Sequence, residues 1–445
     1  MLKLYSLDKK ERHSMKKTRI ALAIATAAMV STPVLATNGD NLIGLGAHSR
    51  AMGGTGTAAF FGSENALTNP GLLGKSEGTE FTIGGTLFMP NVKATTNVAT
   101  GVAGQPAASD TSSADTNIIP EVSLSTRLTD NLTFGLGIFG SAGMGVNYRD
   151  GDPNSATNPN NGLFQAQSNL QIMRFAPSLA YNSGKFGIGF APIIQYGSLD
   201  MNYYKDSDGN GSFDQTVGEG MSSDLGYGYN IGGYFDVMNN LTIGLDYQSA
   251  IDMKYKNQIT TAAGGFGLSG FGNNLEQPAE IKVGVAYDMG NITVTGDYKQ
   301  IAWGSAKGYK DFNWKDQNVF ALGAKYKGQG FWLGAGYNYA EDPIEKMDES
   351  NTNTNAYSNQ ATNLFNNHFF PGIVEQHFTF GGGYGLTKNL AIDGAITYAP
   401  KVTKTVNTTA VSTGLNGGSA PASGTTYHKV EHSQMGYTVS LRMNF

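Results

Sequence analysis

The last nine residues of the chain alternate strictly between apolar and polar side chains. The apolar positions are Tyr437, Val439, Leu441, Met443 and Phe445. A period of two is typical of a β-strand with one apolar face. An unpaired terminal strand would invite aggregation in a water-soluble protein. In a closed outer-membrane barrel it would pair with the first strand and turn its apolar face to lipid, so this feature favours a transmembrane β-barrel.

The composition agrees with a barrel and argues against membrane helices. Only 15% of the 445 residues are charged, against about 25% in a typical soluble domain, and 60 residues are glycine. The only long apolar run lies near the N-terminus, whereas each helical span needs roughly 20 apolar residues. In alternating strands the apolar and polar residues cancel in the mean, so a barrel is consistent with the mean hydropathy of −0.25.

The N-terminus has the features of a secretory signal peptide. Three basic residues precede an apolar stretch of 11 residues (20–30), and Val34-Leu35-Ala36 offers a small-residue cleavage site. An anchor is the alternative, but 11 residues are too few to span a bilayer. We therefore expect residues 1–36 to be a signal peptide and the mature chain to reach the outer membrane of a Gram-negative bacterium.

Charge and cysteine content exclude several classes of function. Removing residues 1–36 would take away seven of 30 basic and two of 35 acidic residues and leave a net formal charge of −10. That balance argues against a nucleic-acid partner. The absence of cysteine excludes disulfides and thiol chemistry and leaves little room for a zinc site.

The mature chain divides into two parts. Residues 37–78 do not alternate, are rich in small side chains, and predict a compact segment of short helical turns that is closed by an Asn-Pro turn. Residues 79–445 alternate and predict an all-β, 14-stranded antiparallel barrel, an even number as expected for closure. The predicted strands are 79–93, 117–128, 131–148, 168–182, 185–203, 225–237, 240–255, 278–289, 291–303, 315–327, 330–340, 374–386, 389–400 and 428–445.

The connections between these strands alternate in length. Tight links such as Thr129-Asp130 and Thr387-Lys388 take turns with long polar links such as 204–224 and 256–277. Short periplasmic turns and long extracellular loops are the outer-membrane pattern. A soluble β-sandwich or propeller with long loops is the alternative.

Alternation also predicts which side chains face the lumen. On 240–255, for example, Ile243 and Leu245 should face lipid and Asp246 the interior. Charges of both signs fall on the inner face and can pair, which predicts a plugged interior rather than an open channel. The charged residues assigned to the lumen are Glu121, Arg127, Arg174, Asp246, Glu280, Lys282, Asp288, Asp297, Lys299, Lys325, Asp393 and Arg442.

The stretch Leu42-Ile-Gly-Leu-Gly-Ala-His-Ser-Arg-Ala-Met-Gly-Gly-Thr-Gly, followed by Asn69-Pro70-Gly71, resembles the N-terminal hatch of the FadL/TodX family. These proteins are outer-membrane transporters for long-chain fatty acids and aromatic hydrocarbons. The resemblance extends over 37–445 and implies a 14-stranded barrel plugged by a hatch at 37–78. It further implies that extracellular loops capture the ligand and that a hatch shift releases it through a wall gap beside a kinked third strand.

Two departures from the family pattern bear on the substrate. The family turn usually reads Asn-Pro-Ala; Gly71 stands in place of the alanine, and we expect the freedom of glycine to preserve the turn. The fatty-acid branch places basic residues near the fifth strand, but only Lys205 is basic in 195–205. A buried carboxylate needs a cationic partner, which Arg174 on the fourth strand could supply. Fatty acid and hydrocarbon both remain open.

Several groups of residues are candidates for the transport path. Gly140, Gly143 and Gly145 could bend the third strand, because glycine permits bulges, although ordinary barrel glycines are the alternative. For the apolar candidates the alternative is plain packing of hatch and loops. The predicted ligand-binding residues are Leu42, Ile43, Leu45, Phe60 and Phe61 in the hatch, Phe139 and Met144 on the third strand, Arg174, and Phe266 and Phe271 in the link 256–277.

One motif in the link 204–224 follows the calcium-loop pattern. Its oxygen-bearing residues are Asp206, Asp208, Asn210, Ser212 and Asp214. The last ligand position should be Glu and is Val217, so a possible calcium site competes with a solvated acidic loop. No other cofactor is expected.

No catalytic constellation is evident, and we do not expect an enzyme, although residues of an outer-membrane hydrolase could be separated in sequence. The predicted function is passive, ligand-gated uptake of hydrophobic compounds. The rivals are a general porin and a structural or adhesive barrel. The expected partners are a hydrophobic small molecule, outer-membrane lipid and, through the C-terminal strand, the barrel-assembly machinery.

Overall fold

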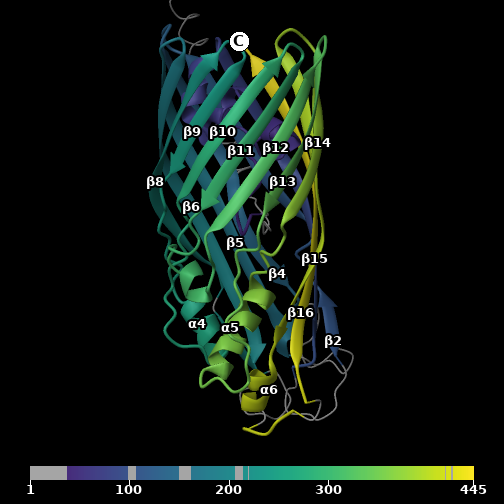
Figure 1. The fold of residues 1–445 in the computed structure, drawn as a ribbon. Helices are drawn as coiled ribbons and strands as arrows, with labels where there is room; N and C mark the ends of the chain where they lie inside the picture. The colour runs from purple at the N-terminus through teal and green to yellow at the C-terminus, as the bar shows by residue number, and fades with distance from the viewer. Residues whose placement is uncertain are drawn as a thin grey trace, which may run out of the picture.

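The strands form one closed antiparallel ring in the computed structural model (Figure 1). The model describes residues 38–98, 107–149, 162–205, 214–218, 220–415, 417–421 and 424–445. The last strand, β16, pairs with the first, β1, from Glu80–Asn444 to Thr96–His428, and this pairing closes the ring. The prediction made from the terminal strand is confirmed.

Within the described residues, fourteen strands make the ring, as predicted. They are β1 (Thr79–Thr96), β3 (Asn117–Arg127), β4 (Leu132–Asn147), β5 (Ala166–Asn182), β6 (Phe186–Lys205), β8 (Ser222–Met238), β9 (Leu241–Gln248), β10 (Glu280–Met289), β11 (Ile292–Ile301), β12 (Gln317–Lys327), β13 (Phe331–Ala340), β14 (Gln376–Gly385), β15 (Leu390–Asn407) and β16 (Tyr427–Asn444). Two short strands lie beside the ring: β2 (Ala108–Thr111) pairs with β1, and β7 (Gln215–Val217) pairs with β6.

The predicted faces are confirmed with one exception. Leu245 is 61% exposed on the outer wall, whereas its neighbour Asp246 is 2% exposed in the lumen. Asp288 was expected inside but is exposed, because it lies at the rim, where its carboxylate accepts a hydrogen bond from Thr293 Oγ1 across the turn. The predicted strand 240–255 was also too long: β9 ends at Gln248.

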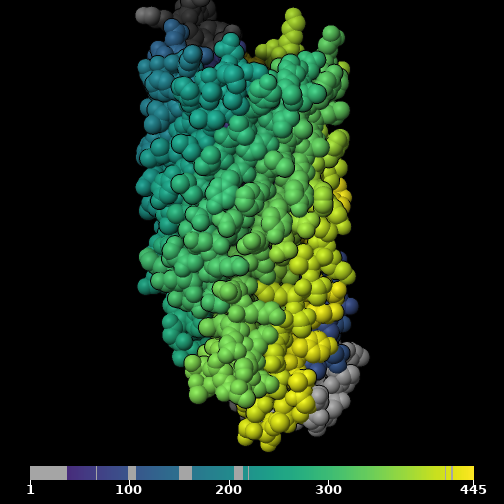
Figure 2. Space-filling view, viewed as in Figure 1, coloured from purple at the N-terminus to yellow at the C-terminus, as the bar shows by residue number. Residues whose placement is uncertain are grey.

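The wall is much taller on one side of the barrel than on the other. Seven strands (β1, β4, β5, β6, β8, β15 and β16) have 16–20 residues, whereas β3 and β9 to β14 have 8–11. About 9–11 residues suffice to cross the bilayer, so the long strands continue beyond it. Figure 2 views the barrel from the side of the shorter strands, where the wall and the loops beyond it form one continuous surface.

The long strands and the long loops together build an extracellular cap. We use this name for the loops that carry α4 (Ile259–Gly265), η4 (Tyr309–Phe312), α5 (Ala356–Phe369) and α6 (Thr409–Leu415), which lie at the end opposite the C-terminus in Figure 1. A short turn, η3 (Gly162–Gln165), precedes β5. Inward side chains of the tall wall, such as Leu170 and Leu199, share one buried apolar cluster with the cap.

The segment 38–78 lies inside the ring and forms the hatch. Its short helical elements are α2 (Ala47–Ala51), η1 (Gly62–Glu64), α3 (Asn65–Thr68) and η2 (Pro70–Lys75), and nearly all of its residues are buried. Lumen-facing groups of widely separated strands hold it: Glu121 of β3 pairs with Arg50, and Thr379 of β14 accepts a hydrogen bond from Gly53 N at 2.9 Å. No helix among the described residues is both long and apolar enough to cross a membrane.

Candidate functional site at the hatch and the β3–β4 wall

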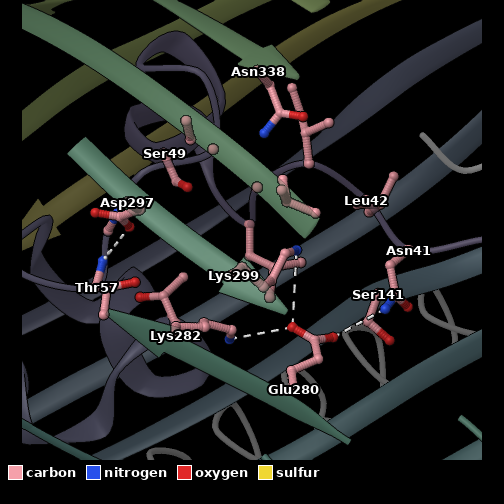
Figure 3. Close-up of a pocket in the computed structure, with 18 of the residues that line it drawn as sticks. Asn41, Leu42, Ser49, Thr57, Ser141, Glu280, Lys282, Asp297, Lys299 and Asn338 are labelled. Atoms are coloured by element: carbon pink, nitrogen blue, oxygen red, sulfur yellow. Dashed lines mark hydrogen bonds and ion pairs between the residues drawn. The ribbon is translucent and has the colours of Figure 1, made fainter. Parts of the chain in front are cut away.

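A cavity of about 60 Å³ lies between the hatch and the barrel wall (Figure 3). Hatch residues 41–45 form one side and inward side chains of β5, β9, β10 and β11 form the other. The cavity brings together four of the predicted ligand-binding residues, which are Leu42, Ile43, Leu45 and Arg174.

The wall side of the cavity is charged. The Glu280 carboxylate accepts a hydrogen bond from Asn41 Nδ2 at 3.0 Å and lies 3.6 Å from Lys282 Nζ and 3.8 Å from Lys299 Nζ (Figure 3). Such pairing makes the buried charges tolerable. An engineered apolar cavity that holds benzene has about 150 Å³, so this smaller, polar space admits an arene only if the hatch moves.

Arg174 is the exception among these charges. Its buried guanidinium donates from Nε to Gln195 Oε1 and from Nη1 to Gln248 Oε1, both at 2.9 Å. Both acceptors are neutral amides, and Nη2 has no partner within the described part of the chain. A buried cation that lacks a carboxylate partner is a ready site for an anionic or acceptor group.

The barrel wall is interrupted between β3 and β4. Their pairing runs from Arg127–Thr133 to Glu121–Phe139 and, in the described residues, extends no further. The next residue of β3 is Pro120, which has no N–H to donate. On its other side β4 pairs with β5 as far as Asn147, but a bulge at Ser141 shifts the register between Gly140 and Ala142.

The hatch covers the edge of β4 that β3 leaves free. Asn41 forms a bridge with Ala142, Leu42 N donates to Ser141 O at 3.2 Å, and Gly143 N donates to Asp40 O at 2.9 Å. We call Asp40–Leu42 the gate segment. A covered strand edge has its backbone groups satisfied, so the gate segment completes the wall at this point.

The three predicted kink glycines have different surroundings. Gly140 directly precedes the bulge, and a Cβ there would lie 2.7 Å from Cγ2 of Ile119 on β3. Gly143 donates its N–H to the gate segment. Gly145 allows close approach of β5, since a Cβ there would lie 2.2 Å from Ser168 O.

The side chain of Asp40 connects the gate segment to the extracellular cap. Its Oδ2 accepts hydrogen bonds from Gln277 Nε2 at 3.0 Å and from the hydroxyl of Tyr309. Burial raises the pKa of Asp40 from 3.8 to about 6, although these two donors and the charge of Arg174 act in the opposite direction. Sequence reasoning missed this group, because its partners are 237 and 269 positions away.

The hatch turn Asn69-Pro70-Gly71 docks on the inner wall of β8 and β9. Asn69 Nδ2 donates to Thr57 O at 2.7 Å and Gly233 O at 3.0 Å, and its Oδ1 accepts from Gly71 N. The turn forms as expected, but it does not depend on the backbone freedom of Gly71. Gly71 is not among the positive-φ glycines, and a Cβ there would lie 2.7 Å from Gly232 O, so the position needs space rather than backbone freedom.

The remaining predicted ligand residues lie outside the cavity lining. Phe60 is 36% exposed, and Phe61 packs in a small cluster with Met52 and stacks on His48. Phe139 and Met144 belong to the large buried cluster of the lumen and cap.

The two loop phenylalanines, Phe266 and Phe271, pack within the cap and do not line the cavity. Phe266 lies edge-on to Phe365 of α5 at 5.5 Å, and Phe271 stacks on Phe312 of η4 at 4.5 Å. They are therefore part of an aromatic cluster that spans several loops.

The structure leaves the calcium prediction untested. Asp206, Asp208, Asn210 and Ser212 lie outside the described residues, and only Asp214 lies within them. In the part of the chain that is described, no group of three or more His, Cys, Asp or Glu residues could hold a metal ion.

Residues 23–353 match the family described as "Outer membrane protein transport protein (OMPP1/FadL/TodX)". The match covers well over half of the chain. The chain belongs to this family. Membership identifies an outer-membrane transport protein and accounts for the barrel with its N-terminal hatch.

Solved structures of other FadL/TodX-like transporters share the fold. The Pseudomonas putida toluene transporter TodX is 20% identical, with a TM-score of 0.63 over 92% of this chain and 100% of that one. The Ralstonia pickettii toluene transporter TbuX is also 20% identical, with a TM-score of 0.60 over 91% and 99%. The monoaromatic hydrocarbon channel CymD is 17% identical, with a TM-score of 0.58 over 92% and 99%.

One curated relative matches only in part. An uncharacterized protein of Chlorobium limicola, from the 5' region of the phosphoenolpyruvate carboxykinase gene, is 44% identical over 66 residues. These residues are 15% of this chain and 32% of that protein, so the chain spans about a third of that relative's length.

Proposed function

We propose that this FadL/TodX family member takes up small hydrophobic molecules through the outer membrane by passive diffusion, and that the gate segment opens and closes the path. Monoaromatic hydrocarbons are the first candidate cargo. The toluene transporters TodX and TbuX and the channel CymD, which have the same fold, support this choice.

The observation that carries the proposal is the interrupted β3–β4 wall with the gate segment in the gap. An apolar cargo makes no favourable contact with the charged inner wall, where Lys282 and Lys299 lie beside Glu280. A sideways path through the gap would keep it in apolar surroundings. That path needs the backbone hydrogen bonds of Asp40–Leu42 to β4 and the side-chain hydrogen bonds of Asp40 and Asn41 to break.

A fatty acid is the second candidate cargo. Arg174 lines the cavity and has an Nη2 without a partner among the described residues. Guanidinium groups bind carboxylates strongly in buried surroundings. Labelled oleate should therefore be compared with labelled toluene in every uptake assay.

Deletion of Ser141 tests the proposed path. Because Gly140 pairs with Met173 and Ala142 with Ile172, removing Ser141 restores a regular ladder and keeps the faces of the flanking residues. A straight β4 can then pair further with β3 and close the gap. We expect uptake to fall at least about tenfold, an effect of roughly 1.4 kcal/mol on the barrier.

The matched control is deletion of Val237, the extra residue at the β8–β9 bulge between Asp236 and Met238. It removes a bulge at the far rim and should leave uptake unchanged. Both variants must first reach the outer membrane as folded, heat-modifiable barrels. If the Ser141 deletion transports as well as the parent protein, the cargo does not leave through this gap.

The other partners belong to the same proposal. The outward row of apolar side chains on β16 ends at Phe445, which is 76% exposed and suited to contact with lipid and with the assembly machinery. Deletion of Phe445 should slow assembly without changing uptake per folded barrel.

A further inference from the structure

We propose that Asp40 is a positioning residue that couples the extracellular cap to the gate segment. While Gln277 and Tyr309 donate to its carboxylate, the gate segment stays in the wall; cargo that enters the cap displaces Tyr309 and releases it. This coupling rests on the proposed path through the β3–β4 gap.

Asp40 is attached to two separate parts of the molecule. Its backbone oxygen accepts the hydrogen bond of Gly143 N on the free edge of β4. Its carboxylate accepts hydrogen bonds from Gln277, on the loop before β10, and from Tyr309 of η4. A movement of η4 therefore acts on the residue that completes the wall.

Tyr309 belongs to an aromatic cluster of the cap. It packs against Trp303 at 4.6 Å and Trp314 at 4.8 Å between ring centroids. At the other end of the four-residue turn η4, Phe312 stacks on Phe271 and, at 5.1 Å, on Phe365 of α5. Rings stack on one another readily, so an arene can replace one of these contacts, and a shift of Phe312 moves Tyr309 with it.

The attachment is also poised for release. The carboxylate is fully buried, and Oδ1 has no partner within the described residues. A buried anionic oxygen without a donor is costly. The free-energy difference between the bound and the displaced gate segment therefore depends on only a few hydrogen bonds. Loss of the donor on Tyr309 leaves Gln277 alone on the other oxygen.

The first arm of the test concerns the gate itself. The chain has no cysteine, so a double variant, Asn41→Cys with Ala142→Cys, places one thiol pair at the bridged positions. Oxidation should lock the gate segment and abolish toluene uptake, and reduction should restore it. If oxidised and reduced forms transport equally, the proposed path fails, whatever the role of Asp40.

The second arm concerns the coupling. In a single Asn41→Cys background, the rate of maleimide labelling in cells reports how often the gate segment leaves the wall. Tyr309→Phe removes one hydrogen bond to a charged group and should speed labelling about tenfold or more. Tyr203→Phe is the matched control, because the Tyr203 hydroxyl donates to Ala262 O in the same cap without touching the gate segment.

A cargo effect separates coupling from mere loss of packing. Toluene should speed labelling of the Asn41→Cys protein and add little in the Tyr309→Phe variant, whose gate segment is already released. Asp40→Asn retains an acceptor oxygen and should fall between the parent and Asp40→Ala. The contrary result is that the Tyr309→Phe and Tyr203→Phe variants label at the same rate while oxidation of the double variant still blocks uptake. That result would support the gate segment as the path and would overturn its coupling to the cap through Asp40.

Discussion

At the scale of single residues, tertiary contacts can determine which residue type fits a position when the local backbone conformation does not. Gly71 is the clearest case. The turn would accept any residue by its backbone angles, but the wall glycines Gly232 and Gly233 approach so closely that no side chain fits.

We expect Gly71→Ala to weaken the packing of the hatch turn against β8. The added Cβ would lie 2.7 Å from both Gly232 O and Gly233 Cα, which are backbone atoms and cannot rotate away. Overpacking of this kind costs about 1–3 kcal/mol. The measurement is the temperature at which the barrel loses its heat-modifiable mobility in detergent.

Gly264→Ala is the control for that change. A Cβ at Gly264 meets nothing within 4 Å, and alanine should slightly favour helix α4. An equal or higher midpoint for Gly71→Ala would mean that β8 yields to the turn and that the close approach does not constrain it.

At the scale of elements, alternation predicted the strands wherever one face meets lipid. It failed where the wall leaves the membrane: β15 continues to Asn407 rather than to 400, and the residues after Gln248 form loop bridges instead of wall. Beyond the bilayer the outer face of a strand can be polar, so apolar and polar residues no longer alternate along the sequence.

The candidate site was predictable only in part, for a similar reason. Leu42, Ile43 and Leu45 stand out as apolar residues in a small-residue segment, and the inward charges Glu280 and Lys282 follow from strand parity. Asp40 with Gln277 and Tyr309 does not, because each lies in an irregular segment and only the fold joins them. The glycines of the third strand did indicate a bend, and the bulge lies among them at Ser141, although the sequence alone does not fix its exact position.

Helix α5 should loosen from the cap in mild acid. Burial lowers the pKa of His368 from 6.5 to about 4, although the hydrogen bond with Leu163 O raises it. The folded cap therefore holds the neutral ring, and this stability is complete above about pH 6.5 and is lost as the pH falls towards about 4. The pKa difference corresponds to about 3 kcal/mol.

Hydrogen–deuterium exchange of 356–369, corrected for the intrinsic effect of pH, measures this loosening. Exchange should accelerate between pH 6.5 and 4.5, and His368→Gln should flatten the profile. Helix α4, which contains no histidine, is the internal control. Equal acceleration of both helices would show general acid unfolding of the cap.

At the scale of the whole molecule, the hatch is bound to strands around the ring at many points besides the gate segment. Lys75 pairs with Asp236 of β8 at 2.7 Å, and Asp297 of β11 accepts from Gly56 N and Thr57 N at 2.9 and 2.8 Å. Together with the contacts to β3 and β14, these bonds would hold the plug in place during the proposed movement of Asp40–Leu42. The proposed path through the wall gap would therefore keep the lumen closed to water and ions along the barrel axis.

Electrical recording distinguishes this arrangement from an open pore. Reconstituted in a planar bilayer, the protein should show no steady ohmic conductance, because the hatch fills the lumen and the cavity beside it, as formed by the described residues, has about 60 Å³. Deletion of residues 38–76 should open a large, stable channel, since β1 and β16 close the ring without the hatch. Steady conductance of the intact protein that is unaffected by locking the Asn41→Cys, Ala142→Cys pair would instead identify a general porin, in which solutes pass along the barrel axis.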